Sequence, residues 1–158
     1  MVRPIAPEDA PGLQAGFREL TPEQVRFRFM RPMSELPDDL AAQLAASCAP
    51  REFALVAIEH GVASPRIGAV VRASTVGHAR EAEFALTVGS PLGGLGLGTL
   101  LLRRLVQWAR LKRLDAVYGD ISHDNTAMLR VAEKLGFQRV HLPDSSGLIR
   151  ARLDLRSA

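Results

Sequence analysis

A short glycine-rich stretch constrains the fold of this chain more than any other feature of its sequence. It reads Pro-Leu-Gly-Gly-Leu-Gly-Leu-Gly-Thr and occupies residues 91–99. An alternating apolar run at 82–88 precedes it, and an apolar run with helical spacing at 100–111 follows it. A strand that ends in glycines and then opens a helix presents consecutive backbone N–H groups at the positive end of a helix dipole. The stretch is therefore either a flexible turn or an anion site suited to phosphate.

The segment before the glycines, residues 81–88, alternates between two kinds of side chain. Phe84, Leu86 and Val88 fall on one face of the predicted strand, which we expect to be buried in the core. The other face carries carboxylates and small side chains, namely Glu81, Glu83, Ala85 and Thr87. Such a face fits the floor of a cleft.

The remaining periodicity predicts one mixed domain. The chain has 158 residues, of which 47% are hydrophobic and 23% charged, as in an ordinary globular domain. Strands are predicted at residues 2–5, 53–58, 66–74, 81–88, 116–121, 138–142 and 148–155. Helices are predicted around Leu13 and Phe17, from Thr21 onward, at 34–49, at 100–111 and around Leu129. The order of helices, meander, helix, strand, helix and hairpin indicates an α/β (α+β) fold.

Two local signals refine these boundaries. Thr21-Pro22-Glu23-Gln24 has the pattern of a capping box, with proline in the first turn of a helix. The residues that follow, Val25, Phe27 and Phe29, also alternate like a strand, so both structures stay open here. Gly136 stands where a left-handed C-terminal cap belongs, and Phe137 is placed for the hydrophobic contact that accompanies one.

Composition disfavours several classes of function. The net charge is only +3, the basic residues are scattered, and the aromatic residues are one Trp, one Tyr and six Phe, so no nucleic-acid partner is expected. No apolar run approaches the length of a membrane span, and Glu8 and Asp9 stand where a signal peptide would be apolar. Cys48 is the only cysteine, and it continues an apolar helical face. We therefore expect a cytoplasmic protein with no membrane partner and no internal disulfide. The four histidines lack the spacing of metal ligands, so no metal is expected.

Three segments together resemble a known family. These are residues 81–99, Asn125-Thr126-Ala127-Met128, and Glu133-Lys134-Leu135-Gly136-Phe137. In this register they are similar to the GNAT superfamily of acyl-CoA-dependent N-acyltransferases, whose acyl-CoA signature corresponds here to residues 93–98. The resemblance implies the GNAT fold, a mixed and mostly antiparallel central sheet flanked by helices, with extra N-terminal helices. It implies that residues 1–158 are a single acetyltransferase domain that uses acetyl-CoA as co-substrate.

A closer likeness is to the acetyltransferase domain of bacterial Pat-type protein lysine acetyltransferases. It is carried by Arg3-Pro4-Ile5, Pro7-Glu8-Asp9-Ala10, Leu20-Thr21-Pro22-Glu23, Arg26-Phe27-Arg28-Phe29 and Ala82-Glu83-Phe84-Ala85. This likeness implies a protein lysine as the acceptor amine. Such proteins often carry a second domain, for which this chain has no room, so we expect a stand-alone catalytic domain. A homodimer is compatible with domains of this kind.

The resemblance also assigns the residues that bind acetyl-CoA. The pyrophosphate falls to the backbone N–H groups of Gly93, Gly94, Leu95, Gly96, Leu97, Gly98 and Thr99. In the family, the strand splays near Val88 so that its N–H polarises the thioester carbonyl, which is oxyanion-type stabilisation. The pantetheine arm would pass along Leu86, Thr87 and Val88. Asn125 matches an asparagine that binds this arm, although the sequence equally allows it to be a helix N-cap.

The catalytic base is assigned by the same resemblance to Glu83. A lysine amine has a reference pKa of about 10.4, so it must lose a proton before it attacks. From pattern alone, Glu83 is better explained as a strand glutamate in a salt bridge. Four residues of strand separate it from Thr87, roughly 13 Å at about 3.3 Å per residue, so proton transfer would pass through water. Glu81 lies on the same face and is the alternative base.

The chain departs from the family pattern at three positions. Gly93 replaces the leading glutamine or arginine of the signature, and Leu95 replaces a residue that is often basic. Ala132 stands where many members have a tyrosine that protonates the leaving thiolate, although Pat-type enzymes commonly lack it too. Two alternatives follow: an acyl-CoA-binding regulatory module with little or no catalysis, and an acetyltransferase of small-molecule amines.

Overall fold

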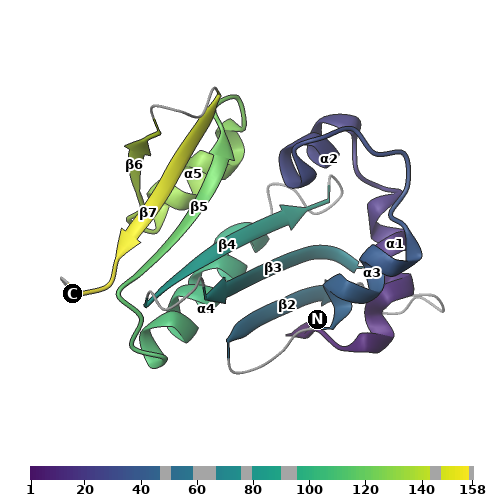
Figure 1. Cartoon of the computed structure of the whole chain (residues 1–158), viewed down its shortest axis with the longest axis horizontal. Helices are drawn as coiled ribbons and strands as arrows, with labels where there is room; N and C mark the ends of the chain where they lie inside the picture. Colours follow the sequence, from purple (N-terminus) through teal and green to yellow (C-terminus); the bar gives the residue numbers. More distant parts are fainter. Residues whose placement is uncertain (47–50, 59–66, 76–79, 90–95, 143–146, 157–158) are drawn as a thin grey trace.

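The described residues form a seven-stranded sheet with helices on both faces (Figure 1). The computed structural model describes residues 1–46, 51–58, 67–75, 80–89, 96–142 and 147–156. The strands are β1 Val2–Pro4, β2 Glu52–Ile58, β3 Ile67–Thr75, β4 Glu81–Val88, β5 Ala116–Ser122, β6 Gln138–His141 and β7 Leu148–Asp154. The helices are η1 Pro7–Asp9, α1 Ala10–Phe17, α2 Pro22–Phe29, α3 Asp38–Ala45, α4 Leu97–Leu111 and α5 Thr126–Lys134. This is the mixed, mostly antiparallel sheet flanked by helices that the family resemblance implies.

The pairing of β4 with β5 is the feature of the sheet that matters most for function. The strand order is β1-β2-β3-β4-β5-β7-β6, and among the described strands β4–β5 is the one parallel pair, the others being antiparallel. That pair extends only from Glu81–Ala116 to Glu83–Tyr118. Beyond it, both strands continue and diverge, as Figure 1 shows. The sheet therefore opens at the carboxyl ends of β4 and β5.

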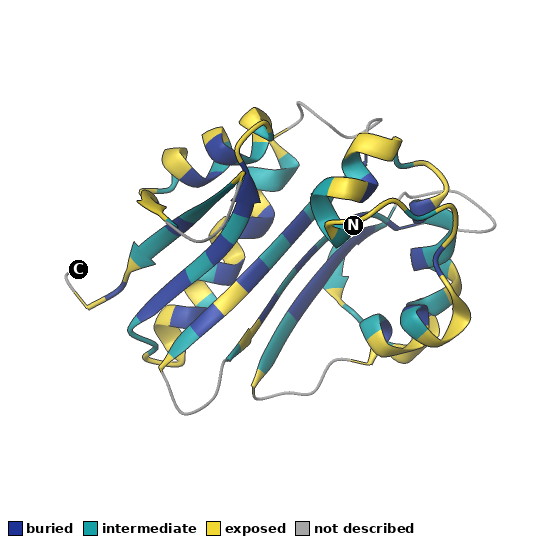
Figure 2. Ribbon diagram, turned by 45° about the horizontal axis from the view of Figure 1, so that its top comes forward, coloured by how far each residue is buried: buried dark blue, intermediate teal, exposed yellow. Residues whose placement is uncertain are grey.

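The two faces of the sheet carry separate apolar clusters. On one face, Phe84 and Leu86 pack with Leu101, Leu102 and Leu105 of α4, all of them buried. On the other face, α1, α2 and α3 enclose a smaller cluster around Val56 of β2. Figure 2 shows buried residues alternating with less buried ones along the central strands. The two-residue periodicity of the sequence thus selects the core face of each strand.

Helix α2 confirms the capping box and excludes the strand alternative for residues 25–29. The Thr21 hydroxyl accepts a hydrogen bond from the Gln24 backbone N–H at 3.1 Å. The Thr21 backbone N–H donates in return to Gln24 Oε1 at 2.9 Å. This reciprocal pair satisfies two N–H groups that the helix start would otherwise leave unpaired.

The end of α5 also agrees with the sequence. Gly136 adopts a φ of 94°, a left-handed conformation that favours glycine. The Phe137 backbone N–H then donates to the Ala132 carbonyl at 3.0 Å. The Phe137 side chain is buried and meets the Phe84 ring edge-on, with ring centroids 5.4 Å apart. The cap therefore fixes α5 against the core face of β4.

The predicted boundaries of two helices are wrong. The helix expected at 34–49 begins only at Asp38, because Pro37 disfavours a helical conformation at Leu36 and is itself extended, with ψ 152°. It ends at Ala45, and Cys48 lies outside the described residues. The helix expected at 100–111 begins three residues earlier, at Leu97, because Gly96 takes a left-handed φ of 75° as its N-cap. No helix in the described part of the chain is long and apolar enough to cross a membrane.

Candidate functional site

The opening between β4 and β5 exposes backbone groups of β4. The Gly89 N–H donates to the Gly68 carbonyl of the β3 side at 2.7 Å. Because backbone groups alternate in direction along a strand, those of Val88 and Leu86 point away from β3 and toward β5. No described strand pairs with them there, since the β4–β5 ladder ends at Glu83. Leu86 can therefore offer its backbone groups, and Val88 its backbone N–H, to a ligand in the opening.

The start of α4 lies against these same β4 residues. A Cβ atom built on Gly98 would stand 3.5 Å from Leu86 Cδ2, 3.6 Å from Val88 Cγ2 and 3.8 Å from Val131 of α5. The structure thus brings the described part of the glycine stretch, 96–99, beside the open end of β4. The first turn of α4 holds no acidic residue, so no negative side chain there neutralises the positive end of the helix dipole. Gly93, Gly94 and Leu95 lie outside the described residues.

Asn125 lies beyond the end of β5, on the side of the opening across from β4. Its Oδ1 accepts a hydrogen bond from the Met128 backbone N–H at 3.3 Å, so it is the N-cap of α5. Its Nδ2 has no hydrogen-bond partner among the described residues. The two roles that the sequence left open are therefore compatible: the oxygen caps the helix while the nitrogen can donate to a ligand.

Helix α2 contacts both sides of the opening, at the end of β4 and just after β5. The sequence does not reveal these contacts. Gln24 Nε2 donates to the Val88 carbonyl at 3.3 Å. Two residues further along, Arg26 Nη2 forms an exposed ion pair with Asp124 Oδ2 at 3.0 Å. Asp124 also accepts a hydrogen bond from the Ser122 hydroxyl at the end of β5. The capping box predicts where α2 begins, but no local signal predicts that it spans the diverging strands.

Glu83 lies on the face of β4 opposite to the core and is exposed. Its neighbours in the sheet are Ser74 of β3 and Tyr118 of β5. Burial and the charge of Glu83 raise the pKa of Tyr118, so its phenol stays protonated. No described residue forms an ion pair with Glu83. The salt-bridge alternative for Glu83 therefore has no support in this part of the chain.

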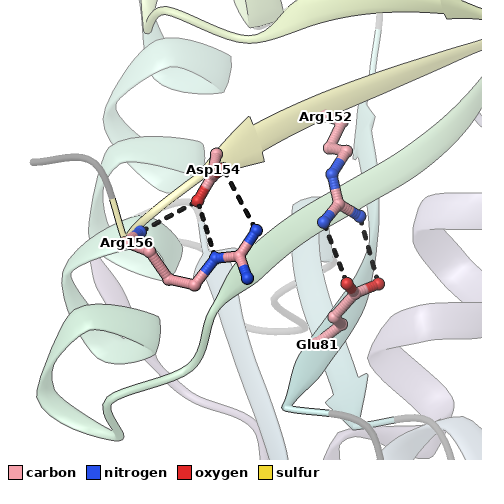
Figure 3. A network of polar contacts seen from close by, with 4 residues as sticks. All are labelled: Glu81, Arg152, Asp154 and Arg156. Carbon is pink, nitrogen blue, oxygen red and sulfur yellow. Dashed lines mark hydrogen bonds and ion pairs between the residues drawn. The ribbon is translucent and has the colours of Figure 1, made fainter.

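Glu81, the alternative base, is already engaged. Both of its carboxylate oxygens accept hydrogen bonds from Arg152 of β7, at 3.1 and 2.9 Å (Figure 3). These hydrogen bonds hold the pKa of Glu81 below its ordinary value. A general base works best with a pKa near the operating pH, so this pairing makes Glu81 a poor one. Two glutamates on one face of β4 are thus placed in different chemical situations.

A second paired arginine borders the same surface. Arg150 of β7 binds both oxygens of Asp120 of β5, at 2.8 and 3.1 Å, and its Cζ lies 4.4 Å from the centroid of the Tyr118 ring. None of Tyr118, Asp120, Arg150 and Arg152 was predicted from the sequence. The alternation of polar residues along β5 and β7 was the available signal, because it places them on the same face as Glu83.

Two other expectations concern proton donors and metals. Ala132, at the family's tyrosine position, is buried in the core and carries no group that could protonate a leaving thiolate. Among the described residues, no cluster of three or more His, Cys, Asp or Glu side chains could hold a metal ion. His123 and His141 are exposed, whereas His60 and His78 lie outside the described ranges.

Comparison with known proteins is consistent across sequence and structure. Residues 1–138 match the family model described as acetyltransferase (GNAT) domain. The acetyltransferase PA5475 of Pseudomonas aeruginosa is 29% identical over 155 residues, which are 98% of this chain and 83% of that protein. The GNAT domain of S. lividans PAT superposes with a TM-score of 0.88 and 24% identity, covering 98% of this chain and 89% of that one. A ribosomal-protein-alanine N-acetyltransferase from Brucella melitensis superposes with a TM-score of 0.73 and 18% identity, covering 98% and 99%.

Proposed function

Because this chain belongs to the GNAT acetyltransferase family and is an acyl-CoA-dependent N-acyltransferase, we propose that it transfers acetyl directly to a protein lysine. Acetyl-CoA is the co-substrate and an amine is the acceptor. The observation that carries the proposal is the three-residue limit of the β4–β5 ladder. It leaves the backbone N–H of Val88 without a strand partner, beside the N-terminus of α4. One surface can therefore hold both the thioester and the pyrophosphate of acetyl-CoA.

Binding of acetyl-CoA falls to backbone groups. The N–H groups of residues 93–99 bind the pyrophosphate at the start of α4, where the helix dipole favours negative charge. The pantetheine arm runs through the opening between β4 and β5, along residues 86–88, with Asn125 Nδ2 as a further donor. The Val88 N–H polarises the thioester carbonyl, and a donor of this kind contributes about 3 kcal/mol to stabilisation of the transition state.

Glu83 acts as the general base of this proposal. It accepts the proton of the acceptor ammonium, through water, because several residues of strand separate its carboxylate from Val88. The neutral amine then attacks the thioester carbonyl, the C–N bond forms, and the C–S bond breaks to release CoA as a thiolate, while the nitrogen of the new amide gives up its second proton to water. Ala132 supplies no proton, so the thiolate leaves without a general acid, as the resemblance to Pat-type enzymes implies.

The choice of a protein lysine rests on likeness. The Pat-type motifs run through η1, α2 and β4, and the S. lividans PAT domain has a similar fold. A further solved structure of similar fold is named as a putative phosphinothricin N-acetyltransferase, so acceptors differ among proteins of this shape. The alternative of a CoA-binding module with little catalysis rests on Gly93 and Leu95, which remove two side-chain donors from the phosphate site.

Calorimetric titration with acetyl-CoA tests the proposal. We expect saturable binding at or below millimolar concentration, because the phosphate site relies on backbone groups that Gly93 and Leu95 do not remove. Replacing Glu83 with Gln should leave this binding unchanged, since the carboxylate lies outside the proposed CoA contacts. An absence of binding heat at millimolar acetyl-CoA would refute the proposal.

A further inference from the structure

A small cavity lies between the sheet and the three N-terminal helices. It has a volume of about 70 Å³ and is lined mainly by apolar side chains of α1, α2, α3 and β3, including Phe17, Phe29, Leu44 and Ile67. Thr87 of β4 also lines it, next to the proposed acetyl site. One water needs roughly 10–15 Å³ of such volume, so the cavity takes a short group of about five non-hydrogen atoms.

Two arginines enter this apolar cavity from separate elements. Arg28 of α2 and Arg72 of β3 both line it, and both side chains are half-buried. Arg72 Nη2 donates to the Leu44 carbonyl near the end of α3, at 2.8 Å. The Arg28 guanidinium lies 4.9 Å from the centroid of the Phe29 ring. No carboxylate in the described part of the chain forms an ion pair with Arg28.

The charges of these two arginines are poorly compensated. Burial, together with the charge of Arg72, lowers the pKa of Arg28 to about 10. Burial also lowers the pKa of Arg72, against the opposing effect of Glu52. Both side chains remain cationic at neutral pH. Holding two half-buried guanidinium groups beside each other is unfavourable unless an anion joins them. Among the described residues, every fully buried side-chain nitrogen has a hydrogen-bond partner. The nitrogens of Arg28 that have no partner are therefore accessible.

The register of β3 and β4 places this charge beside the proposed reaction site. Ser74 lies opposite Glu83, Arg72 opposite Ala85, and Val70 opposite Thr87. Arg72 therefore stands one row from Glu83 and one row from Thr87 on the same face, and each row is about 7 Å along the strand. An anion bound by Arg72 would lie between the proposed base and the Val88 end of β4.

We propose that Arg28 and Arg72 bind a carboxylate of the acceptor and thereby hold its amine between Glu83 and Val88. The inference rests on the proposed function, because it names the chemistry of the acceptor at that same site. Arginine presents a planar fork of N–H donors that matches a carboxylate, and the apolar lining accepts a short carbon chain next to it. The carboxylate is either an acidic side chain beside a peptide lysine or the carboxylate of a small amino acid.

Binding of a minimal carboxylate tests the site without any acetyl transfer. Propionate and propionamide have similar shapes and differ in charge, and each is titrated by NMR into protein saturated with CoA. We expect propionate to bind wild type at least about tenfold more tightly than propionamide, as charge-assisted hydrogen bonds imply. The variant Arg28→Met should remove this ratio. Arg110→Met, which changes an exposed arginine at the end of α4, should preserve it.

Equal binding of the two probes to wild type, or an unchanged ratio in Arg28→Met, would overturn the inference. If Arg28→Met does not fold, Arg28→Lys replaces it. That variant keeps the charge and loses the fork, so its ratio should fall below that of wild type. An unchanged ratio in Arg28→Lys would also count against the site.

Kinetics distinguish the source of the carboxylate. One arm compares lysine peptides that carry Asp or Asn next to the lysine, and the other compares L-leucine with L-leucinamide. In the comparison that matches the natural acceptor, the carboxylate should lower KM about tenfold. Arg28→Met should abolish that difference with little effect on kcat. If acceptors react without preference in both arms, the inference fails and the proposed function stands. If no acceptor releases thiol, the proposed function fails while the propionate titration still decides the carboxylate site.

Discussion

Replacing Glu83 with Gln is expected to lower the turnover of acetyl transfer by about 10²-fold, and by no less than about tenfold, while acetyl-CoA still binds. The neutral amide that this substitution introduces cannot accept the proton of the acceptor ammonium. The deficit should shrink as the pH rises toward the pKa of the amine, about 10.4, because the acceptor then loses its proton without a base. Steady-state release of free thiol from pH 7 to pH 10 measures both effects.

Glu81→Gln is the matched control, since it removes a carboxylate two residues away on the same face. It breaks a half-buried ion pair with Arg152, so the free energy of unfolding should fall by about 1 kcal/mol. Turnover should remain within about twofold of wild type, because the pairing makes Glu81 a poor base. Undiminished turnover in Glu83→Gln would clear Glu83 of the catalytic role, and a large loss of turnover in Glu81→Gln alone would transfer that role.

The variant Gly16→Ala is expected to lower the free energy of unfolding by about 3 kcal/mol. Gly16 brings α1 close to β3, and a Cβ atom there would overlap the backbone carbonyl oxygen of Ile67. Neither group is the end of a flexible side chain, so the helix must move away from the sheet. Alanine favours a helix over glycine by about 1 kcal/mol, which is too little to offset the clash. Urea denaturation followed by circular dichroism gives the change.

Gly98→Ala provides the comparison, because it also replaces a helical glycine. Its Cβ would meet only side chains, at 3.5 Å or more, so the free energy of unfolding should stay the same or rise by up to about 1 kcal/mol. If Gly16→Ala were as stable as Gly98→Ala, the close approach of α1 to β3 would be contradicted.

Local sequence patterns predicted the elements that build the site, and chiefly β4. Its bounds, 81–88, follow from alternation alone, and the structure confirms them. The capping box at Thr21 predicts the start of α2 because both partners lie within one turn. The start of α4 was predicted three residues too late, since the glycine pattern does not show which glycine adopts the left-handed conformation.

The contacts that give these elements their chemistry could not be predicted, because they join distant residues. Arg152 lies 71 residues from Glu81, and only the order β4-β5-β7 in the sheet brings them together. The contact of Gln24 with Val88 depends likewise on how α2 packs over the opening. Arg28 belongs to a family motif in the sequence, but its place beside Arg72 requires the tertiary fold.

The most direct test of acetyl transfer is one reaction in which released CoA thiol and acetylated amine are counted together. Wild-type protein, acetyl-CoA and a panel of lysine peptides and small amines are incubated, and mass spectrometry follows the amines while a thiol reagent follows CoA. The proposed function predicts equal amounts of the two products with at least one acceptor. Saturable binding of acetyl-CoA with neither product, across a broad panel, would contradict catalysis and indicate a CoA-binding module instead.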